Sequence, residues 1–196
     1  MSDSNMKIGQ MFLAGFDGTE IDQDHWITSA IREEHLGGVI LFDRNVDGSR
    51  QNISSPEQLT ELTATMQAFS EIPLIVAVDQ EGGRVCRLKE LDGFPPTVSA
   101  ARLGCEKNLN ESRRNASRMA EVQSACGITM NLAPVVDLDL NPDNPIIARY
   151  ERSYGKLTAD ILQQASVFID AHHAQGIACC LRRVNRTYSV MCRKLR

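Results

Sequence analysis

The amino-acid sequence predicts an α/β fold with a parallel sheet, namely the N-terminal four to five β/α units of a TIM (β/α)8 barrel. Short apolar segments of strand length alternate with helical patterns, which is typical of parallel β/α proteins. Polar residues gather just after the strand ends, and no GxGxxG or phosphate-binding loop follows a strand, which favours a barrel over a doubly wound sheet. A complete barrel needs eight strands and roughly 250 residues, so 196 residues hold a part of one.

Several segments are predicted to be strands because they are nearly continuously apolar, as strands covered on both faces are. They are Gly37–Phe42, Pro73–Asp79 and Gly127–Asp137, followed by Gly176–Leu181. The earlier segment Ile8–Phe16 is expected to be either the first strand or a helix that caps the barrel floor.

Helical patterns fill the intervals between these strands. One helix is predicted to begin at Pro56, with Ser55 as its N-cap and apolar residues at three- and four-residue spacing behind it. Asn110 is the expected N-cap of a second helix. A third is predicted over Leu157–Gln175, and an earlier one over Asp24–His35.

Composition excludes several classes of partner. The formal net charge of -4 and the lack of a basic stripe before residue 182 argue against nucleic acid and acidic membranes, whereas a small neutral substrate is compatible with both. No apolar run approaches the ~20 residues of a membrane span. The start MSDSNMKIGQM lacks the basic and apolar regions of a signal peptide. We therefore expect a cytoplasmic protein with a small-molecule substrate.

The cysteines are expected to be reduced and inert, because they form no CxxC pair and no Cys/His spacing suited to zinc. Neither a metal ion nor an organic cofactor is expected. The six cysteines are Cys86, Cys105, Cys126, Cys179, Cys180 and Cys192.

The segment VDQEGGRVCRL is the most informative motif. A buried strand ends in Asp79, two glycines then allow a tight turn or a close approach to a ligand, and arginines follow. Asp79 can accept hydrogen bonds from sugar hydroxyls, and Arg87 can donate to hydroxyl or carbonyl oxygens. Alternatively, Asp79 caps its own loop or pairs with Arg84, and the residues alone leave both interpretations open.

A second polar segment, NLAPVVDLDLNPDNPII followed by ERSYG, comes after the third predicted strand. Asp137 and Asp139 form a candidate acid pair for glycoside hydrolysis, although a hydrogen-bonded loop is the favoured interpretation. We expect Asp79 and Asp137 to lie at the same C-terminal face of the sheet. His172 and His173 are interpreted as structural, at a helix C-terminus that favours a charged histidine.

These two segments resemble the bacterial β-N-acetylhexosaminidases of glycoside hydrolase family 3. DQEGGRVCRL is similar to the family's DxEGGRVxR, and the second segment to APVxDxxxNPxNPxI followed by RSYG. The resemblance implies a TIM barrel that removes terminal N-acetylglucosamine with retention, in peptidoglycan recycling and without a cofactor. It also implies that Asp79, Arg87 and Arg152 bind the sugar, with Arg149 as the fallback for Arg152. The supporting loop residues would be Glu81, Gly82, Gly83, Arg84, Asp137, Asn141 and Asn144.

The resemblance covers residues 8–181, interpreted as a partial family 3 barrel domain, and stops there. The family continues with KHFPGHG and later supplies its catalytic His and nucleophilic Asp, whereas this sequence continues RRVNRTYSVMCRKLR. No catalytic residue is therefore assigned. Residues 182–196 contain five Arg and one Lys but no acidic residue, which is consistent with a shifted reading frame or a truncated product. A genuine divergent basic tail is the alternative.

Three functions follow as hypotheses. The first is a β-N-acetylhexosaminidase whose present chain is truncated and inactive, and the second is a non-catalytic sugar-binding remnant. The third is a β-glucosidase-like member of the family, which the position of DQEGGRV close to the N-terminus disfavours. Exposed barrel edges are expected to promote self-association.

Overall fold

A computed structural model describes residues 3–183. Its five strands form a single sheet in the order β1-β2-β3-β4-β5, and every neighbouring pair is parallel. This confirms the predicted α/β fold with a parallel sheet. Within the described residues, β1 and β5 each have a neighbouring strand on one side. The strands are β1 (Leu13–Ala14), β2 (Gly38–Leu41), β3 (Ile75–Val78), β4 (Met130–Asn131) and β5 (Ala178–Cys179).

The centre of the sheet is the pair β2 and β3. Val39 lies opposite Val76 and Leu41 opposite Val78, and all four side chains are fully buried. Residues two apart point to the same face of a strand, so these four form one layer that packs into the main core. Continuous burial explains why the sequence of these strands is apolar throughout rather than alternating.

The strand predicted over Gly127–Asp137 is wrong in length, because regular pairing covers β4 alone. Proline has no amide hydrogen to donate to a ladder, and Pro134 follows three residues after β4. Parallel pairing resumes beyond it as a single bridge between Val135 and Arg182. The Pro134 carbonyl still accepts a hydrogen bond from the Arg182 amide at 2.9 Å.

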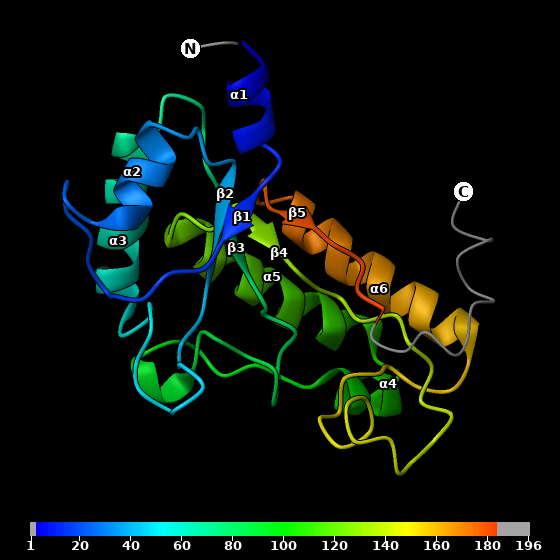
Figure 1. Ribbon diagram of the computed structural model, residues 1–196. Helices are drawn as coiled ribbons and strands as arrows, with labels where there is room; N and C mark the ends of the chain where they lie inside the picture. The colour runs from blue at the N-terminus through cyan, green and yellow to red at the C-terminus, as the bar shows by residue number, and fades with distance from the viewer. Residues whose placement is uncertain (1–2, 184–196) are drawn as a thin grey trace.

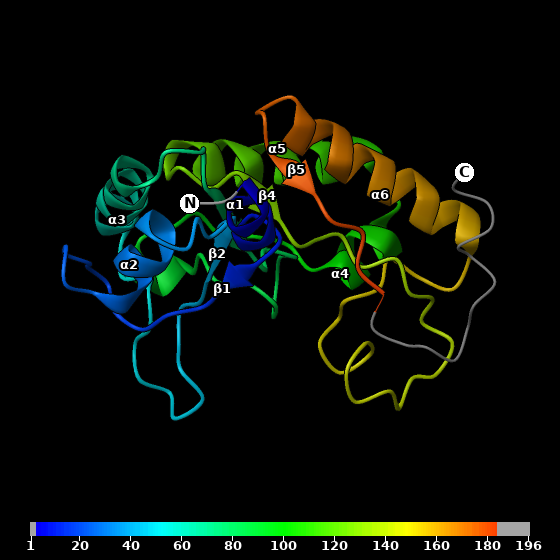
Figure 2. The same cartoon turned by 45° about the horizontal axis from the view of Figure 1, so that its top comes forward.

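Figure 2 shows helices α3, α5 and α6 in an arc along one side of the sheet, and Figure 1 shows the connecting loops that extend beyond the strand ends. The major core lies between the sheet and the helices that follow β1 and β2, and smaller clusters lie under α4, α5 and α6. No helix in the described part of the chain is long and apolar enough to span a membrane. The helices are α1 (Asp3–Gly9), α2 (Trp26–Arg32), α3 (Pro56–Phe69), the 3-10 turn η1 (Glu90–Asp92), α4 (Ala100–Glu106), α5 (Leu109–Ala125) and α6 (Thr158–His173).

The helix boundaries confirm one predicted cap and correct another. Ser55 caps α3, since its hydroxyl accepts from the Gln58 amide at 3.2 Å. Asn110 is not the cap of α5. Its neighbour two residues earlier, Asn108, has the extended backbone of an N-cap, and its side chain accepts from the amides of Asn110 and Glu111.

The N-terminal segment Ile8–Phe16, predicted to be either a strand or a helix, contains the end of a helix and the first strand. A helix ends at Gly9, and β1 begins at Leu13 and pairs with β2. Several apolar side chains around β1 are exposed: Met11 is 80% exposed, Phe12 60% and Leu13 41%. They lie at the edge of the sheet, where β1 has no described neighbour on its outer side.

Candidate functional site

The site begins where β3 ends. Asp79, Gln80 and Glu81 follow β3 directly, and all three side chains are buried. Buried carboxyl and amide groups need hydrogen-bond or charged partners, so their surroundings determine how the site is built. The carboxyl ends of parallel strands are the face at which barrel enzymes place their chemistry.

Gln80 folds the following loop back onto the strand end. Its side-chain Oε1 accepts from the backbone amides of Arg87 at 2.9 Å and Leu88 at 3.0 Å. The amide of Glu81 also donates to the Val85 carbonyl at 3.0 Å, which closes the loop. As a result, Arg87 returns to the neighbourhood of Asp79 although it lies eight positions further along the chain.

Gly82 and Gly83 allow this loop to approach the next segment closely. Both have positive φ values, of 96° and 60°. A β-carbon at Gly82 would lie 2.5 Å from the Val98 carbonyl oxygen, and one at Gly83 would lie 2.5 Å from the Ser99 β-carbon. These distances are below van der Waals contact, so the structure requires glycine at both positions.

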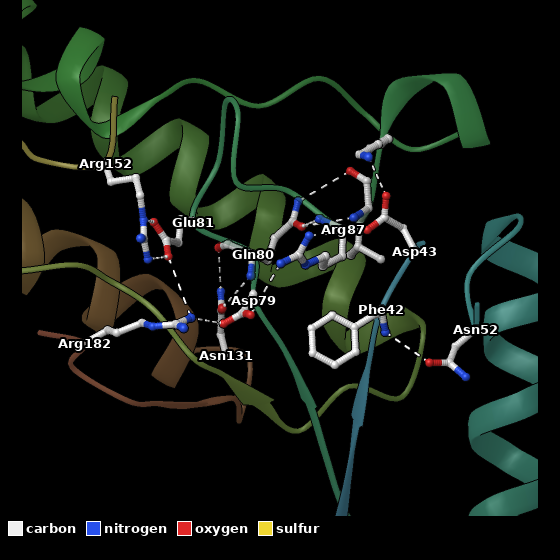
Figure 3. Close-up of polar contacts among 12 residues, drawn as sticks. Phe42, Asp43, Asn52, Asp79, Gln80, Glu81, Arg87, Asn131, Arg152 and Arg182 are labelled. Atoms are coloured by element: carbon white, nitrogen blue, oxygen red, sulfur yellow. Dashed lines mark hydrogen bonds and ion pairs between the residues drawn. The ribbon is translucent and has the colours of Figure 1, made fainter. Parts of the chain in front are cut away.

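Asp79 is paired with two arginines, as Figure 3 shows. Its Oδ2 lies 3.6 Å from Arg87, and its Oδ1 forms an ion pair with Arg182. Arg87 also lies 3.5 Å from the buried Asp43 and 5.3 Å from the centre of the Phe42 ring. Phe42 and Asp43 directly follow β2, so segments that follow β2, β3 and β5 contribute to this part of the site.

Glu81 and Arg152 form a buried pair with two parallel hydrogen bonds. Arg152 Nε donates to Glu81 Oε2 at 2.8 Å and its NH2 to Oε1 at 2.6 Å, with side chains 9% and 4% exposed. Burial acts to lower the pKa of Arg152, but hydrogen bonding and the charge of Glu81 outweigh it and the pKa is raised. The pair fixes the guanidinium plane of Arg152.

The predicted alternative partner of Asp79, Arg84, points elsewhere. Its guanidinium donates to the Arg149 carbonyl at 2.9 Å and lies 3.4 Å from Glu151. Arg149, the fallback for Arg152, is exposed, and its guanidinium lies over the Tyr150 ring. The described geometry therefore places Arg152, rather than Arg149, beside Glu81 and Asp79.

The Asp137–Asn144 segment is a hydrogen-bonded loop. Asn144 Oδ1 accepts from the amides of Ile146 and Ile147 at 2.9 and 2.8 Å, and Asn141 Oδ1 accepts from the Asp143 amide at 3.0 Å. The buried Asp137 accepts through its carbonyl from the Ser153 hydroxyl at 2.6 Å.

A pocket of about 260 Å³ brings the three predicted sugar-binding residues together. Arg182, which the sequence placed at the first position of the basic tail, also lines it. Its position directly after the fifth predicted strand could have indicated a site residue. The sequence analysis instead assigned it to the basic tail because residues 182–196 are rich in arginine. The rest of the predicted basic tail, residues 184–196, lies outside the described residues. The lining residues are Asp79, Arg84, Val85, Arg87, Ile146, Tyr150, Arg152 and Arg182.

His172 differs from the sequence prediction of a charged histidine. It is fully buried and stacked on Phe168 with ring centres 4.1 Å apart. Burial lowers its pKa to about 4, because the desolvation of a buried imidazolium outweighs the favourable helix C-terminus.

The cysteines of the described chain are free. Cys179 packs against the cluster of α5 and α6, whereas its neighbour Cys180, which follows β5, is exposed. Burial raises the pKa of the Cys179 thiol to about 12 and also raises that of Cys86, so neither is a reactive thiolate near neutral pH. Within residues 3–183, no three His, Cys, Asp or Glu side chains lie close enough to hold a metal ion.

The fold and site together define a class. A parallel β/α sheet with carboxylates and arginines converging at its strand ends is the construction of a TIM-barrel enzyme. Comparison with protein families narrows this class. The chain belongs to glycosyl hydrolase family 3, since the model of the family's N-terminal domain matches residues 4–183.

The relatives of the chain are glycosidases. A β-hexosaminidase of Idiomarina loihiensis is 38% identical over 149 residues, covering 74% of this chain and 41% of the relative. Another, of Xanthomonas euvesicatoria, is 30% identical over 190 residues, covering 88% and 49%. The chain thus spans less than half the length of these relatives.

Solved structures agree with this assignment. A family 3 β-N-acetylglucosaminidase from a Paenibacillus species superimposes with a TM-score of 0.83 at 29% identity, covering 93% of this chain and 33% of the other. NagZ from Neisseria gonorrhoeae, in complex with N-trifluoroacetyl-D-glucosamine, gives 0.76 at 26% identity, covering 87% and 48%.

Proposed function

We propose that this chain forms the sugar-binding part of a β-N-acetylhexosaminidase that releases terminal N-acetylglucosamine with retention. The observation that carries the proposal is the convergence of Asp79, Arg87 and Arg152 on one pocket at the strand ends. Membership of glycosyl hydrolase family 3 and relatives described as β-hexosaminidases support it.

The side chains of the pocket suit a neutral sugar. The Asp79 carboxylate already pairs with two arginines, yet each carboxylate oxygen has a second lone pair that can accept from a hydroxyl. Arg87 and Arg152 are held by Asp43 and Glu81, so their remaining N–H groups are oriented to donate to hydroxyl or carbonyl oxygens. The proposed substrate is a peptidoglycan fragment, and the proposed location is the cytoplasm.

The 196-residue chain is expected to bind this sugar without hydrolysing it. Residues 182–196 do not contain the KHFPGHG sequence that the resemblance places after the fifth strand. Ground-state contacts supply affinity, but groups that bind the transition state more strongly are needed for rate. Loss of a proton-transfer group alone costs ~10²- to 10⁴-fold in rate.

The test combines binding and turnover. Titration with N-acetylglucosamine, followed by NMR, should give saturable shifts that Asp79→Asn or Arg152→Lys weakens, while Arg114→Lys on the exposed face of α5 leaves them unchanged. Release of p-nitrophenol from its N-acetyl-β-glucosaminide should be absent for this chain. A comparable titration with glucose distinguishes the β-glucosidase-like alternative. Equal affinity for glucose, or no saturable binding of either sugar, would contradict the proposal.

A further inference from the structure

A buried amide holds the segment between the two carboxylates of the site. Asn131, the last residue of β4, is fully buried. Its Oδ1 accepts from the backbone amide of Gln80 at 3.1 Å, and its Nδ2 donates to the backbone carbonyl of Gln80 at 3.0 Å. Gln80 lies between Asp79 and Glu81, so this pair of hydrogen bonds clamps the backbone from which both carboxylates project (Figure 3).

The clamp works in one orientation of the Asn131 amide. If oxygen and nitrogen exchanged places, the oxygen would face the Gln80 carbonyl and the nitrogen would face the Gln80 N–H. Both hydrogen bonds would then become repulsive contacts in a buried place, where unpaired polar groups are costly. The Gln80 backbone therefore favours one orientation of the Asn131 amide, and a further acceptor beside Nδ2 would hold that orientation more firmly.

His172 supplies this further acceptor. Its Nδ1 lies 2.8 Å from the Phe168 carbonyl oxygen, and because a carbonyl can only accept, Nδ1 carries the hydrogen. In the neutral ring, Nε2 is then an acceptor. It lies 3.1 Å from Nδ2 of Asn131 and 3.3 Å from Nε2 of Gln123, both donors. The series of hydrogen bonds runs from α6 through β4 to the loop after β3.

We propose that His172 is a positioning residue of the site: its Nε2 fixes the Asn131 amide, which in turn holds the Gln80 backbone so that Asp79 and Glu81 face their arginine partners. His172 does not line the pocket, and it acts through two intervening residues. As an effect on sugar affinity, the inference rests on the proposed function. As an effect on the geometry of the two carboxylates, it stands independently.

The discriminating experiment compares two substitutions at one position in the 196-residue chain. His172→Gln can present an oxygen acceptor to Asn131, whereas His172→Leu fills the space without an acceptor. Ile161→Val, fully buried in the same helix, is the control for a change in core packing. Each variant is titrated with N-acetylglucosamine, and the ¹³C resonances of the Asp79 and Glu81 carboxyl groups are measured by NMR.

The expected result is that His172→Leu weakens sugar binding by about tenfold, the equivalent of one lost hydrogen bond, and moves both carboxyl resonances. His172→Gln and Ile161→Val should stay within about threefold of the wild type with unchanged resonances. Asn131→Asp, which keeps the shape but loses the donor to both His172 and the Gln80 carbonyl, should reproduce the Leu result. His172→Phe, which keeps a ring but has no acceptor, replaces His172→Leu if that variant does not fold.

Two results would overturn the inference. Either His172→Leu, or His172→Phe in its place, retains affinity and both carboxyl resonances, or Ile161→Val changes them as much as His172→Leu does. If the wild-type chain binds no sugar, the proposed function fails, and the carboxyl resonances alone then test the positioning role.

Discussion

At the scale of single residues, burial determines how much an ion pair affects the stability of the folded chain. The Glu81–Arg152 pair is removed from water, whereas a similar pair on α5, Glu111 and Arg114, is largely exposed. Removing one partner of a buried pair leaves the other charge without compensation, but removing one partner of an exposed pair exchanges it for water. The two pairs therefore provide a matched comparison within one chain.

We expect Glu81→Gln to lower the free energy of unfolding by about 3 kcal/mol, because Arg152 keeps its charge in a buried place. Glu111→Gln should leave it nearly unchanged, because the pair is exposed to solvent. Urea denaturation followed by circular dichroism measures both. Equal small changes would show that the site pair is as well solvated as the surface pair.

The burial of His172 leads us to expect a decrease in the free energy of unfolding at acidic pH. Its pKa is about 4 in the fold, against 6.5 for the free side chain. The buried neutral imidazole contributes its full stabilisation of the folded state above pH 6.5. This stabilisation is lost as the pH falls towards 4, because the unfolded chain takes up the proton first. The full loss is about 3 kcal/mol. Urea denaturation at pH 7 and pH 4.5 should show a smaller decrease for His172→Gln than for the wild type, and parallel decreases would contradict a buried neutral histidine.

A comparison of Gly82 with Gly48 distinguishes the cost of a positive φ from the cost of close packing. Both have positive φ values, of 96° and 87°, but a β-carbon at Gly82 meets the Val98 carbonyl and one at Gly48 meets open space. We expect Gly82→Ala to cost about 1 to 3 kcal/mol more than Gly48→Ala, measured by thermal unfolding. Equal costs would mean that the Gly82 loop relaxes freely.

At the scale of elements, the cap of α5 gives a prediction that local sequence alone could not make. Asn108→Ala should destabilise the chain by about 1 kcal/mol, since two amides of the first turn lose their acceptor. Asn110→Ala, inside the helix, should change stability by less than about 0.5 kcal/mol. Denaturant unfolding of the two variants decides between them, and a larger effect at Asn110 would restore the original prediction.

Elements with strong local signals could be predicted from the sequence. Ser55 and Pro56 mark the start of α3 by chemistry that acts within one turn, and the apolar runs of β2 and β3 reflect burial on both faces. The α4 helix, Ala100–Glu106, was missed because seven residues carry little periodic pattern. Asn108 and Asn110 have the same capping chemistry, so the choice between them depends on the backbone.

The parts of the site that come from one short sequence segment could be predicted from the sequence. Asp79 and Arg87 belong to one motif, and Gln80 folds that motif back on itself. The contact of Arg182 with Asp79 depends on strand pairing across more than one hundred residues. The neutral state of His172 depends on packing of α6 over β4. The position of Arg182 directly after the fifth predicted strand is a local signal for the site but does not indicate Asp79 as its partner, and the neutral state of His172 has no local sequence signal.

At the scale of the whole molecule, the exposed edge of β1 is expected to cause self-association. Met11, Phe12 and Leu13 present apolar surface at an edge of the sheet where β1 has no described neighbour, and such an edge favours pairing with another chain. Phe12→Lys should reduce the sedimentation-equilibrium mass towards that of a monomer, whereas Val46→Lys in an exposed loop should not. A monomeric wild-type chain at all concentrations would contradict this.

The order of the strands has a consequence for how the site is made during synthesis. Each strand from β2 onward pairs with the one before it in sequence, so its neighbour has already been translated when it leaves the ribosome. Asp79 and Glu81 are laid down with the third strand, Arg152 arrives before the last helix, and Arg182 closes the pocket after the fifth strand. The two carboxylates are therefore translated before Arg182, the last of their described cationic partners.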